Sequence, residues 1–307
     1  MQETRHPELL VTAKDIEEIK QLIDAGADAI NIGGEEYGLR MPGNFTLEMI
    51  GQATELAHSH GVKVYVSMNA LLHNDHLHQL ESYIKTLAEF KVDAIVYGDP
   101  AILLTASQLA PEIKLHWNTE TTSTNYTTVN YWAKKGATRA VLARELSLEE
   151  VIDVKKHVQI EVQAQIHGLT CIFHSKRTLV SSYLDHITHQ EEKKASKESN
   201  LFLREHKRPD EKYPVFEDIH GTHIMSNDEI SMIEHLNLLI DAGIDSLKIE
   251  GLLLPTDYLV YLTKTYRQAI DLYLEKQEIP FNNEEIEKAQ KNKRPLTTGF
   301  YFKEQIY

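Results

Sequence analysis

DAGADAI, at residues 24–30, is the stretch that decides the fold, because variants of it recur along the chain. Each variant places a helix end, a turn built on glycine or another small residue, and the start of an apolar strand in the same order. A repeated helix–strand unit is typical of a parallel sheet surrounded by helices. The variants are EFKVDAI at 89–95, KKGATRAV at 134–141 and DAGIDSL at 241–247.

Short apolar runs alternate with amphipathic stretches, and the runs predict about eight strands. In the first amphipathic stretch, Ile16, Ile19, Leu22 and Ile23 recur at helical spacing and Gly26 ends the helix. No predicted strand is followed directly by the motif G-x-G-x-x-G, so the sequence gives no support for a dinucleotide-binding fold. The pattern therefore predicts an α/β fold, a (β/α)8 TIM-type barrel. The predicted strands are 8–12, 29–32, 63–67, 94–97, 113–117, 140–143, 160–166 and 246–249.

The periodic pattern breaks once, between the predicted strands seven and eight. Residues 185–220 are polar and charged, and helical periodicity resumes at 222–243 as the last inter-strand helix. Loops of this length in compact domains are functional lids or disordered segments, and both readings stay open. We therefore expect a barrel over 1–256 that contains the insertion. Residues 257–307 are expected to form a long helix, a short acidic helix and an extended arm that pack on the barrel.

The bulk composition of the 307 residues excludes several protein classes. The formal net charge of −14 disfavours general attraction to a polyphosphate backbone. Cys171 is the single cysteine, so the chain can form neither an internal disulfide nor a site made of several of its own cysteines. There is no signal-peptide pattern and no run of about 18 apolar residues. We expect a soluble, cytoplasmic protein without membrane contact.

The ends of the predicted strands carry many polar side chains. In a barrel of this type the reacting groups lie at the carboxyl ends of the strands, although any one polar residue there can be only a turn or cap residue. Ser147 with Glu150 is explained as a capping box, whereas Arg144 is not explained in that way and is the best anion-binding candidate. The strand-end residues are Thr12, Lys14, Asn31, Glu35, Tyr37, Arg40, Asn69, His73, Asn74, Asp99, Asn118, Thr119, Glu120, Arg144, Glu145, His167, Cys171 and Glu250.

His167, Cys171 and His174 allow two readings besides ordinary packing. With His186, His189, His206, His220 and His223 they suggest metal binding, but the spacings match no compact zinc pattern, and no metal is predicted. Alternatively, Cys171 and a histidine form a nucleophilic pair that Asp185 or Glu250 orients. A lone cysteine in an apolar stretch is more often a small core residue.

Several stretches, in this order, resemble the U32 peptidase family. The resemblance covers the chain up to about residue 275, and it extends to the shorter of two adjacent members found in Gram-positive bacteria. The stretches include GGEEYGLR at 33–40, GVKVYVSMNALLHND at 61–75, VLARELSLEE at 141–150, IHGLTC at 166–171 and DSLKIEG at 245–251.

The resemblance implies a barrel protein that supports RNA hydroxylation more than proteolysis. Family members often carry a four-cysteine [4Fe-4S] cluster, and several work as pairs of homologous subunits. Here Cys171 matches the first cluster ligand, but Thr178 stands at the second, and Leu252 replaces the arginine of the family's E-G-R. We therefore expect no cluster in this chain, and no other cofactor.

The resemblance and the strand-end residues together give three functional hypotheses. The first is a subunit of a prephenate-dependent tRNA wobble-uridine hydroxylation system that acts with a cluster-bearing U32 homologue. The second is a U32 peptidase that uses Cys171 with His167 or a metal, and the third is a non-catalytic assembly partner. Direct tRNA contact is possible through Lys193, Lys194, Lys291, Lys293 and Arg294. The predicted catalytic residues are His167, Cys171 and Glu250. The residues predicted to bind a small carboxylic acid such as prephenate are Arg40, Asn69, Asn118, Arg144 and Glu145.

Overall fold

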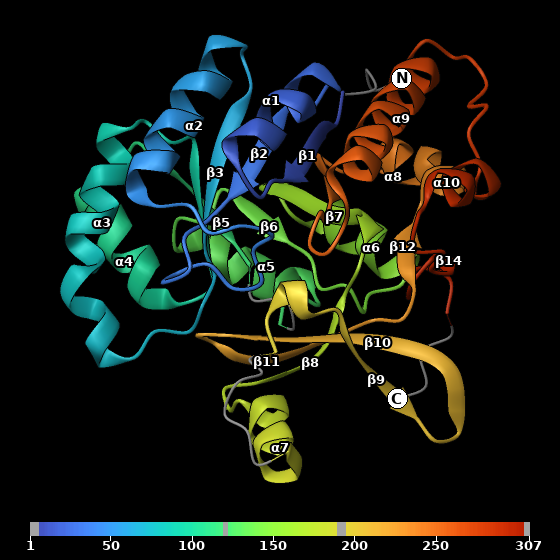
Figure 1. The fold of residues 1–307 in the computed structure, drawn as a ribbon. Helices are drawn as coiled ribbons and strands as arrows, with labels where there is room; N and C mark the ends of the chain where they lie inside the picture. The colour runs from blue at the N-terminus through green and yellow to red at the C-terminus, as the bar shows by residue number, and fades with distance from the viewer. Residues whose placement is uncertain (1–5, 119–121, 189–194, 304–307) are drawn as a thin grey trace.

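The structure, a computed structural model, describes residues 6–118, 122–188 and 195–303. Eight parallel strands form a closed ring, because the last of them pairs with both the first and the seventh. The fold is therefore the predicted TIM-type (β/α)8 barrel (Figure 1). The ring strands are β1 (Glu8–Thr12), β2 (Ala29–Ile32), β3 (Lys63–Met68), β4 (Ala94–Tyr97), β5 (Lys114–Trp117), β6 (Arg139–Val141), β7 (Glu161–Gly168) and β13 (Ser246–Ile249).

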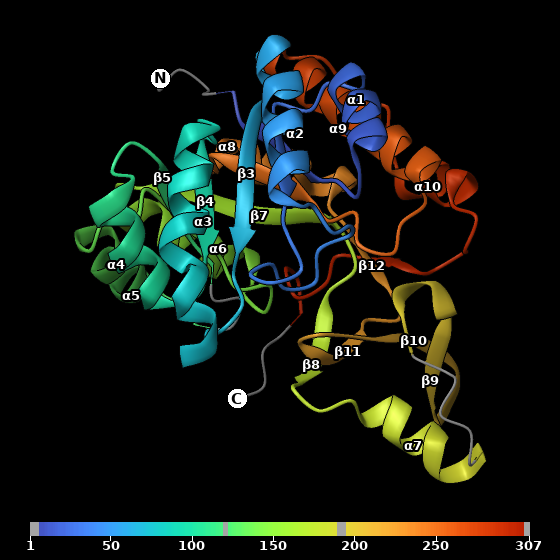
Figure 2. The same ribbon diagram turned by 60° about the vertical axis from the view of Figure 1, so that its left-hand side comes forward.

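Helices surround the ring and cover its apolar outer face (Figure 2). Five of the ten described below begin where the sequence supplies a side chain that accepts a backbone N–H bond, namely Asp15, Thr46, Asp99, Asn125 and Ser147. The surrounding helices are α1 (Ile16–Asp24), α2 (Leu47–Ser59), η1 (Asn74–His76), α3 (Leu77–Glu89), α4 (Pro100–Leu109), α5 (Tyr126–Lys134), α6 (Leu148–His157), η3 (Ile233–His235), α8 (Leu236–Asp241) and α9 (Thr256–Leu274).

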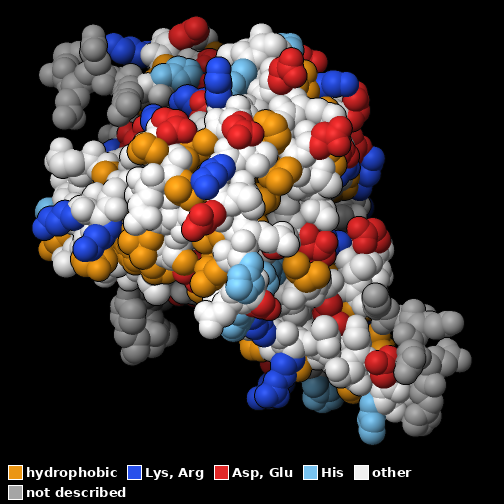
Figure 3. All heavy atoms as spheres, turned by 90° about the vertical axis from the view of Figure 1, so that its left-hand side faces the viewer, with side chains coloured by type: hydrophobic (Ala, Val, Ile, Leu, Met, Phe, Trp, Pro, Cys, Tyr) orange, Lys and Arg blue, Asp and Glu red, His pale blue; other side chains and the backbone are white. Residues whose placement is uncertain are grey.

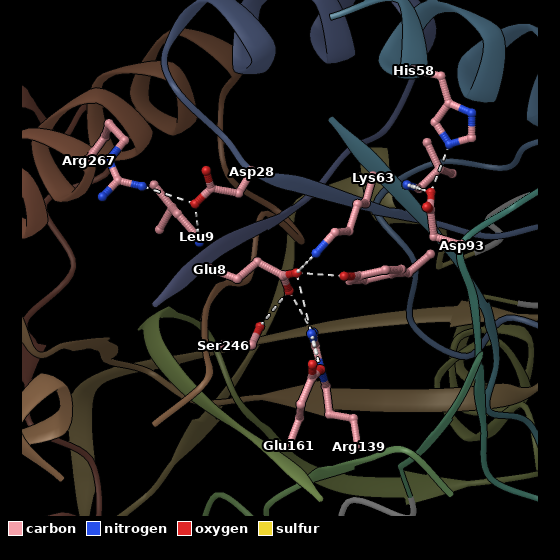
Figure 4. A network of polar contacts seen from close by, with 12 residues as sticks. Glu8, Leu9, Asp28, His58, Lys63, Asp93, Arg139, Glu161, Ser246 and Arg267 are labelled. Atoms are coloured by element: carbon pink, nitrogen blue, oxygen red, sulfur yellow. Dashed lines mark hydrogen bonds and ion pairs between the residues drawn. The ribbon is translucent and has the colours of Figure 1, made fainter. Parts of the chain in front are cut away.

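A network of ion pairs fills the amino-terminal end of the ring (Figure 4). Arg139 donates to Glu8 at 2.6 Å and to Glu161 at 2.6 Å, and its side chain is only 3% exposed. The Tyr65 hydroxyl and Ser246 also donate to Glu8. Because these residues come from β1, β3, β6, β7 and β13, the network joins strands around the whole ring.

The segment between β7 and β13 is more ordered than the sequence predicts. Its described part forms a four-stranded antiparallel sheet in the order β8-β11-β10-β9, with α7 beside it (Figure 2). The described residues of the polar stretch 185–220 are therefore largely strand, not a structureless loop. The elements are β8 (Cys171–Ser175), α7 (Leu179–Thr188), η2 (Lys197–Ser199), β9 (Leu201–Glu205), β10 (Arg208–Asp218) and β11 (Gly221–Met225).

The prediction of one helix over 222–243 is wrong. The first part of that stretch belongs to β11, residues 229–231 form β12 (Glu229–Ser231), and only η3 and α8 are helical. The strand β12 pairs with β7 on one side and with β14 (Leu296–Thr297) on the other. Between α9 and β14 lies the short acidic helix α10 (Asn283–Ala289).

The carboxyl-terminal segment returns to the barrel. Tyr301 donates to the Gln165 carbonyl on β7 at 2.8 Å, and the Leu148 N–H of α6 donates to the Tyr301 carbonyl at 2.9 Å. Among the described helices, none is long and apolar enough to cross a membrane.

Candidate binding pocket at the barrel mouth

A pocket opens at the carboxyl-terminal end of the ring, where the sequence predicts a site. It has two lobes that share Asn118, Arg144, Lys248 and Glu250. The outer lobe extends toward β2, β3 and the insertion sheet, and the inner lobe extends between β6 and β7. The outer lobe adds Asn31, Leu39, Arg40, Met41, Ser67, Asn69, Leu169, Met225 and Leu252, and the inner lobe adds Val141, Leu142, Gln163 and Gln165.

Arg40 and Arg144 bring two guanidinium groups to the outer lobe. Arg40 is 8% exposed and has a φ of 56°, a left-handed conformation that an arginine rarely adopts. Backbone strain of this kind persists where the surrounding structure demands it, often at functional sites. Burial lowers the pKa of Arg40 to about 10, and the charge of Arg144 acts in the same direction. Burial also lowers the pKa of Arg144, but both side chains remain cationic at neutral pH.

Glu250 and Lys248 form an ion pair that both lobes share. The Lys248 ammonium lies 2.8 Å from Glu250 Oε2, and the Thr12 hydroxyl donates to Glu250 Oε1 at 2.9 Å. Burial alone would raise the pKa of Glu250, but Lys248 and Thr12 outweigh burial, so the pKa lies below its ordinary value. Glu250 is therefore a carboxylate at neutral pH. Arg40 and Arg144 add two further cationic side chains to the pocket lining.

Two predicted amides lie at the pocket, with different surroundings. Asn69 accepts a hydrogen bond from the Leu39 N–H at 2.9 Å and so holds the loop that carries Arg40. Asn118 is 7% exposed, and its Oδ1 has no hydrogen-bond partner among the described residues. Glu145 is exposed and lies outside the residues that line the pocket.

His167 lies away from the pocket. Its ring nitrogens contact the hydroxyls of Tyr266 and Tyr258 on α9 at 3.2 and 3.3 Å, and Glu229 of β12 lies 3.5 Å away. Strict alternation along β7 would place residue 167 inside the ring with Gln163 and Gln165. The β7–β13 register shifts between Lys248 and Ile249, and His167 is directed outward.

Cys171 begins β8 at the edge of the pocket and is partly exposed. Its thiol lies within hydrogen-bond distance of the Phe173 carbonyl, at 3.2 Å. Because the His167 nitrogens contact tyrosines, these two residues do not form a nucleophile–base pair in the structure. The side chains of Arg40 and Arg144 lie close enough to Cys171 to interact with it electrostatically.

The predicted histidine group separates into structural contacts. His174 stacks on His223 with 4.6 Å between ring centroids, His223 lies 2.9 Å from Asp218, and His220 contacts the Glu35 carbonyl at 2.8 Å. The His220 contact, together with Lys197, which donates to the Met41 carbonyl, joins the insertion to the loop after β2. Within the residues that the structure describes, no group of three or more His, Cys, Asp or Glu could hold a metal ion. His189, Thr119, Glu120, Lys193 and Lys194 lie outside the described residues.

Sequence reasoning missed several pocket residues, and strand alternation could have found some of them. Ser67 and Lys248 each lie two positions before a predicted residue, Asn69 and Glu250, and so share its side of the strand. Leu169 and Met225 carried no such signal, and Leu252 was recognised only as the residue that replaces the arginine of the family's E-G-R. They pack with Phe216 in an apolar cluster where the insertion sheet meets the barrel mouth.

Comparison with known proteins identifies the family. The profile of Peptidase family U32 matches residues 14–306. The chain is 48% identical over 311 residues to tRNA hydroxylation protein P2 of Bacillus subtilis (strain 168), covering 99% of this chain and 100% of the relative. It is 35% identical to tRNA hydroxylation protein P1 of the same organism, covering 88% of this chain and 64% of the relative. It is 30% identical to tRNA hydroxylation protein P of Escherichia coli (strain K12), and the alignment covers 86% of this chain and 68% of the relative.

Solved structures support the fold. The U32 peptidase Mk0906 aligns with a TM-score of 0.51 at 15% identity, over 80% of this chain and 92% of that one. Tryptophan synthase from M. tuberculosis in its ligand-free form aligns with a TM-score of 0.50 at 10% identity, over 87% of this chain and 94% of that one. The profile match and the full-length similarity to P2 show that this chain belongs to peptidase family U32.

Proposed function

We propose that this chain is a component of a tRNA hydroxylation system that modifies the wobble uridine and binds a small carboxylic acid such as prephenate. The observation that carries the proposal is the cationic pocket at the mouth of a barrel that is similar over its whole length to a tRNA hydroxylation protein. The proposed reaction is taken from the name of that relative. The proposed anionic ligand is inferred from the arginine and lysine side chains that line the pocket.

The proposed acid lies with its carboxylate groups toward Arg40 and Arg144. A guanidinium matches a carboxylate in shape and charge and binds it through two parallel hydrogen bonds. Lys248, held by Glu250, adds a third cation next to Arg144. The amides of Asn69 and Asn118 then orient the rest of the molecule. The position of His167 outside the pocket leaves it a structural role.

A [4Fe-4S] cluster does not fit this chain. Four thiolates hold such a cluster, and Cys171 is the only cysteine in the sequence. The nearest described side chains on the paired strand, such as Met225 opposite Cys171, do not replace them. We therefore propose that a cluster-bearing U32 homologue supplies any chemistry that needs a cluster. The occurrence of two similar relatives, P1 and P2, in one organism supports a paired arrangement.

The surface of the insertion supports such a partner. Eight of the 15 large hydrophobic side chains that the structure describes as exposed fall in residues 171–219. Clustered exposed apolar side chains mark surfaces that bind another protein. By contrast, Figure 3 shows a barrel face where acidic and basic side chains are intermixed, without a continuous basic band for RNA. The eight are Ile172, Phe173, Leu179, Tyr183, Ile187, Phe202, Leu203 and Ile219.

The test is deletion of the gene followed by mass spectrometry of total tRNA. We expect the hydroxylated wobble uridine to disappear and to return with the wild-type gene but not with Arg144→Ala. The matched control is Lys264→Ala, which removes an exposed cation of α9 that lines neither lobe of the pocket. In vitro, Arg144→Ala should weaken binding of prephenate by more than about tenfold while the chain stays folded.

Two results would contradict the proposal. Unchanged tRNA in the deletion strain would remove the hydroxylation role. Full rescue by Arg144→Ala would instead show that the pocket takes no part in it. The peptidase reading has less support, because His167 contacts α9 tyrosines rather than Cys171.

A further inference from the structure

The pocket at the barrel mouth is nearly closed in this structure. Its outer and inner lobes have volumes of about 20 and 30 Å³. A single water molecule needs roughly 10–15 Å³, and pockets that take small organic molecules measure about 300–1,000 Å³. A small organic ligand therefore fits only if part of the lining moves away.

The four-stranded insertion sheet supplies a part of the lining that can move. It lies at the carboxyl-terminal end of the ring (Figures 1 and 2). Met225 of β11 and Leu169, which lies just before β8, line the outer lobe. With Phe216 of β10 they pack against Leu252 of the barrel, which is 1% exposed. The sheet thus forms one wall of the pocket and shields the barrel side chain beneath it.

The insertion sheet is separate from the main barrel core. Among the described residues, those of β8, β9, β10 and β11 contribute no side chain to the large apolar cluster that joins the ring strands to their helices. The sheet packs on the barrel through the smaller cluster of Leu169, Phe216, Met225 and Leu252. Segments with few buried apolar contacts open at a lower free energy than the whole fold. The sheet can therefore move while the barrel stays folded.

The two connections between the sheet and the barrel lie side by side and form a hinge. The chain enters the sheet through residues 168–171 and leaves it through 225–229. The Ser226 N–H donates to the Thr170 carbonyl at 2.8 Å, and the Thr170 N–H donates to the Ser226 hydroxyl at 3.1 Å. Hinges are short connections of this kind, in which a few residues absorb the change in backbone angles.

Two side chains of the insertion, outside the hinge, hold it against the loop after β2. His220 Nε2 lies 2.8 Å from the Glu35 carbonyl oxygen, and the Lys197 ammonium donates to the Met41 carbonyl. Both carbonyls belong to the loop that carries Arg40, so these contacts meet the barrel beside the pocket. Each contact joins one side chain to one backbone carbonyl and can break without unfolding either part.

We propose that the insertion sheet is a lid that must swing away from the loop after β2 before a ligand can enter the pocket, and that His220 and Lys197 are its latch. Opening breaks the two latch contacts and exposes Leu252 to solvent, while the ring strands keep their pairing. The inference goes beyond the proposed function, because it concerns access to the pocket and holds for any ligand that the pocket takes.

The test is the rate at which iodoacetamide modifies a cysteine placed under the lid. The reporter is Leu252→Cys in the full chain with Cys171→Ser, so that it carries the only thiol. A second reporter, Ala106→Cys in the same background, replaces a fully buried residue of α4 and reacts only when the barrel itself opens. Met225→Cys, on the lid side of the small cluster, takes the place of Leu252→Cys if circular dichroism shows that the latter does not fold.

We expect the thiol under the lid to react at least about tenfold faster than the α4 thiol, because the lid opens at a lower free energy than the barrel. It should react far more slowly than free cysteine, since the lid is closed most of the time. The rate should rise in proportion to the concentration of iodoacetamide, as expected when closing is faster than modification.

Removal of either latch contact should accelerate the reaction under the lid. His220→Phe and Lys197→Met each take away one hydrogen bond, and we expect each to raise the rate at least about fivefold while the α4 reporter is unchanged. The matched controls are His206→Phe and Lys207→Met, which alter exposed side chains of the same insertion and should leave both reporters unchanged.

Four outcomes overturn the inference. Equal rates for the two reporters would mean that the thiol under the lid reacts only when the barrel unfolds. A rate equal to that of free cysteine would mean that the pocket stands open in solution. Latch variants that change neither reporter, or both equally, would show that these contacts do not hold a lid. Because the test uses neither tRNA nor an acid, its result is independent of whether the proposed function holds.

Discussion

Replacement of Arg139 by methionine is expected to destabilise the barrel by about 3–5 kcal/mol at pH 7, because it leaves the buried Glu8 carboxylate without its main counter-ion. Arg139 donates to Glu8 and Glu161 through four contacts between 2.6 and 3.3 Å. Glu8, with a side chain 9% exposed, would keep only Tyr65, Ser246 and the half-exposed Lys63. The measurement is urea unfolding followed by circular dichroism.

The pH dependence of this loss gives a second check. Burial would raise the pKa of Glu8, but Arg139, with smaller contributions from Tyr65 and Lys63, outweighs burial and holds the pKa below its ordinary value of 4.5. In the wild type this contribution to stability is present above pH 4.5 and is lost as the pH falls through the folded pKa. Without Arg139, burial raises the pKa of Glu8, and protonation at acid pH relieves the unpaired charge. The difference between variant and wild type should therefore shrink below about pH 4.5.

Two controls separate the network from general effects. Lys63→Met removes a half-exposed ion pair with the same carboxylate and should cost less than about 1 kcal/mol. The double variant Glu8→Gln, Arg139→Met should be more stable than Arg139→Met alone, because it removes the stranded charge. A loss below about 1 kcal/mol for Arg139→Met, or a loss that does not change with pH, would refute the reasoning.

Two other predictions concern the segment after β7. Gly168→Ala should destabilise the chain by about 1–3 kcal/mol in urea unfolding, since its φ is 104° and an added Cβ would lie 2.2 Å from the Glu250 carbonyl oxygen. Gly61→Ala is the matched control: it has a φ of 73° but no atom within 4 Å, and should cost less; equal losses would contradict the steric argument. Cys171→Ser should retain wobble-uridine hydroxylation in the complementation assay, because the proposed function assigns the thiol no reaction. Loss of the modification in this variant would restore the thiol to the mechanism.

The barrel could be predicted because its signal is local and repeated. Each phrase such as DAGADAI contains its own helix stop, turn and strand start, and the predicted strands agree with the ring strands to within one or two residues at each end. The small sheet of the insertion gave no such signal. In β9 and β10 charged residues stand among apolar ones without regular alternation, because β9 and the first half of β10 are largely exposed on both faces and have no buried face to impose a period of two.

The pocket could be predicted in part for a related reason. Residues that directly follow a ring strand, such as Arg144 and Glu250, were found because the carboxyl ends of parallel strands meet. Gln163 lies inside the ring before the strand ends, so a search of the strand ends did not include it. The position of His167 away from the pocket could not be predicted, since the register shift that turns it outward involves β13, about 80 residues away along the chain.

The pairing that closes the ring has a consequence for synthesis of the chain. β1 pairs with β13, and the Ser246 hydroxyl that donates to Glu8 is 238 residues away. On the ribosome, β1 therefore has an unpaired edge until most of the protein has been made. Long-range parallel pairing of this kind folds slowly, and exposed strand edges favour aggregation. The nascent chain should depend on chaperones more than the finished protein does.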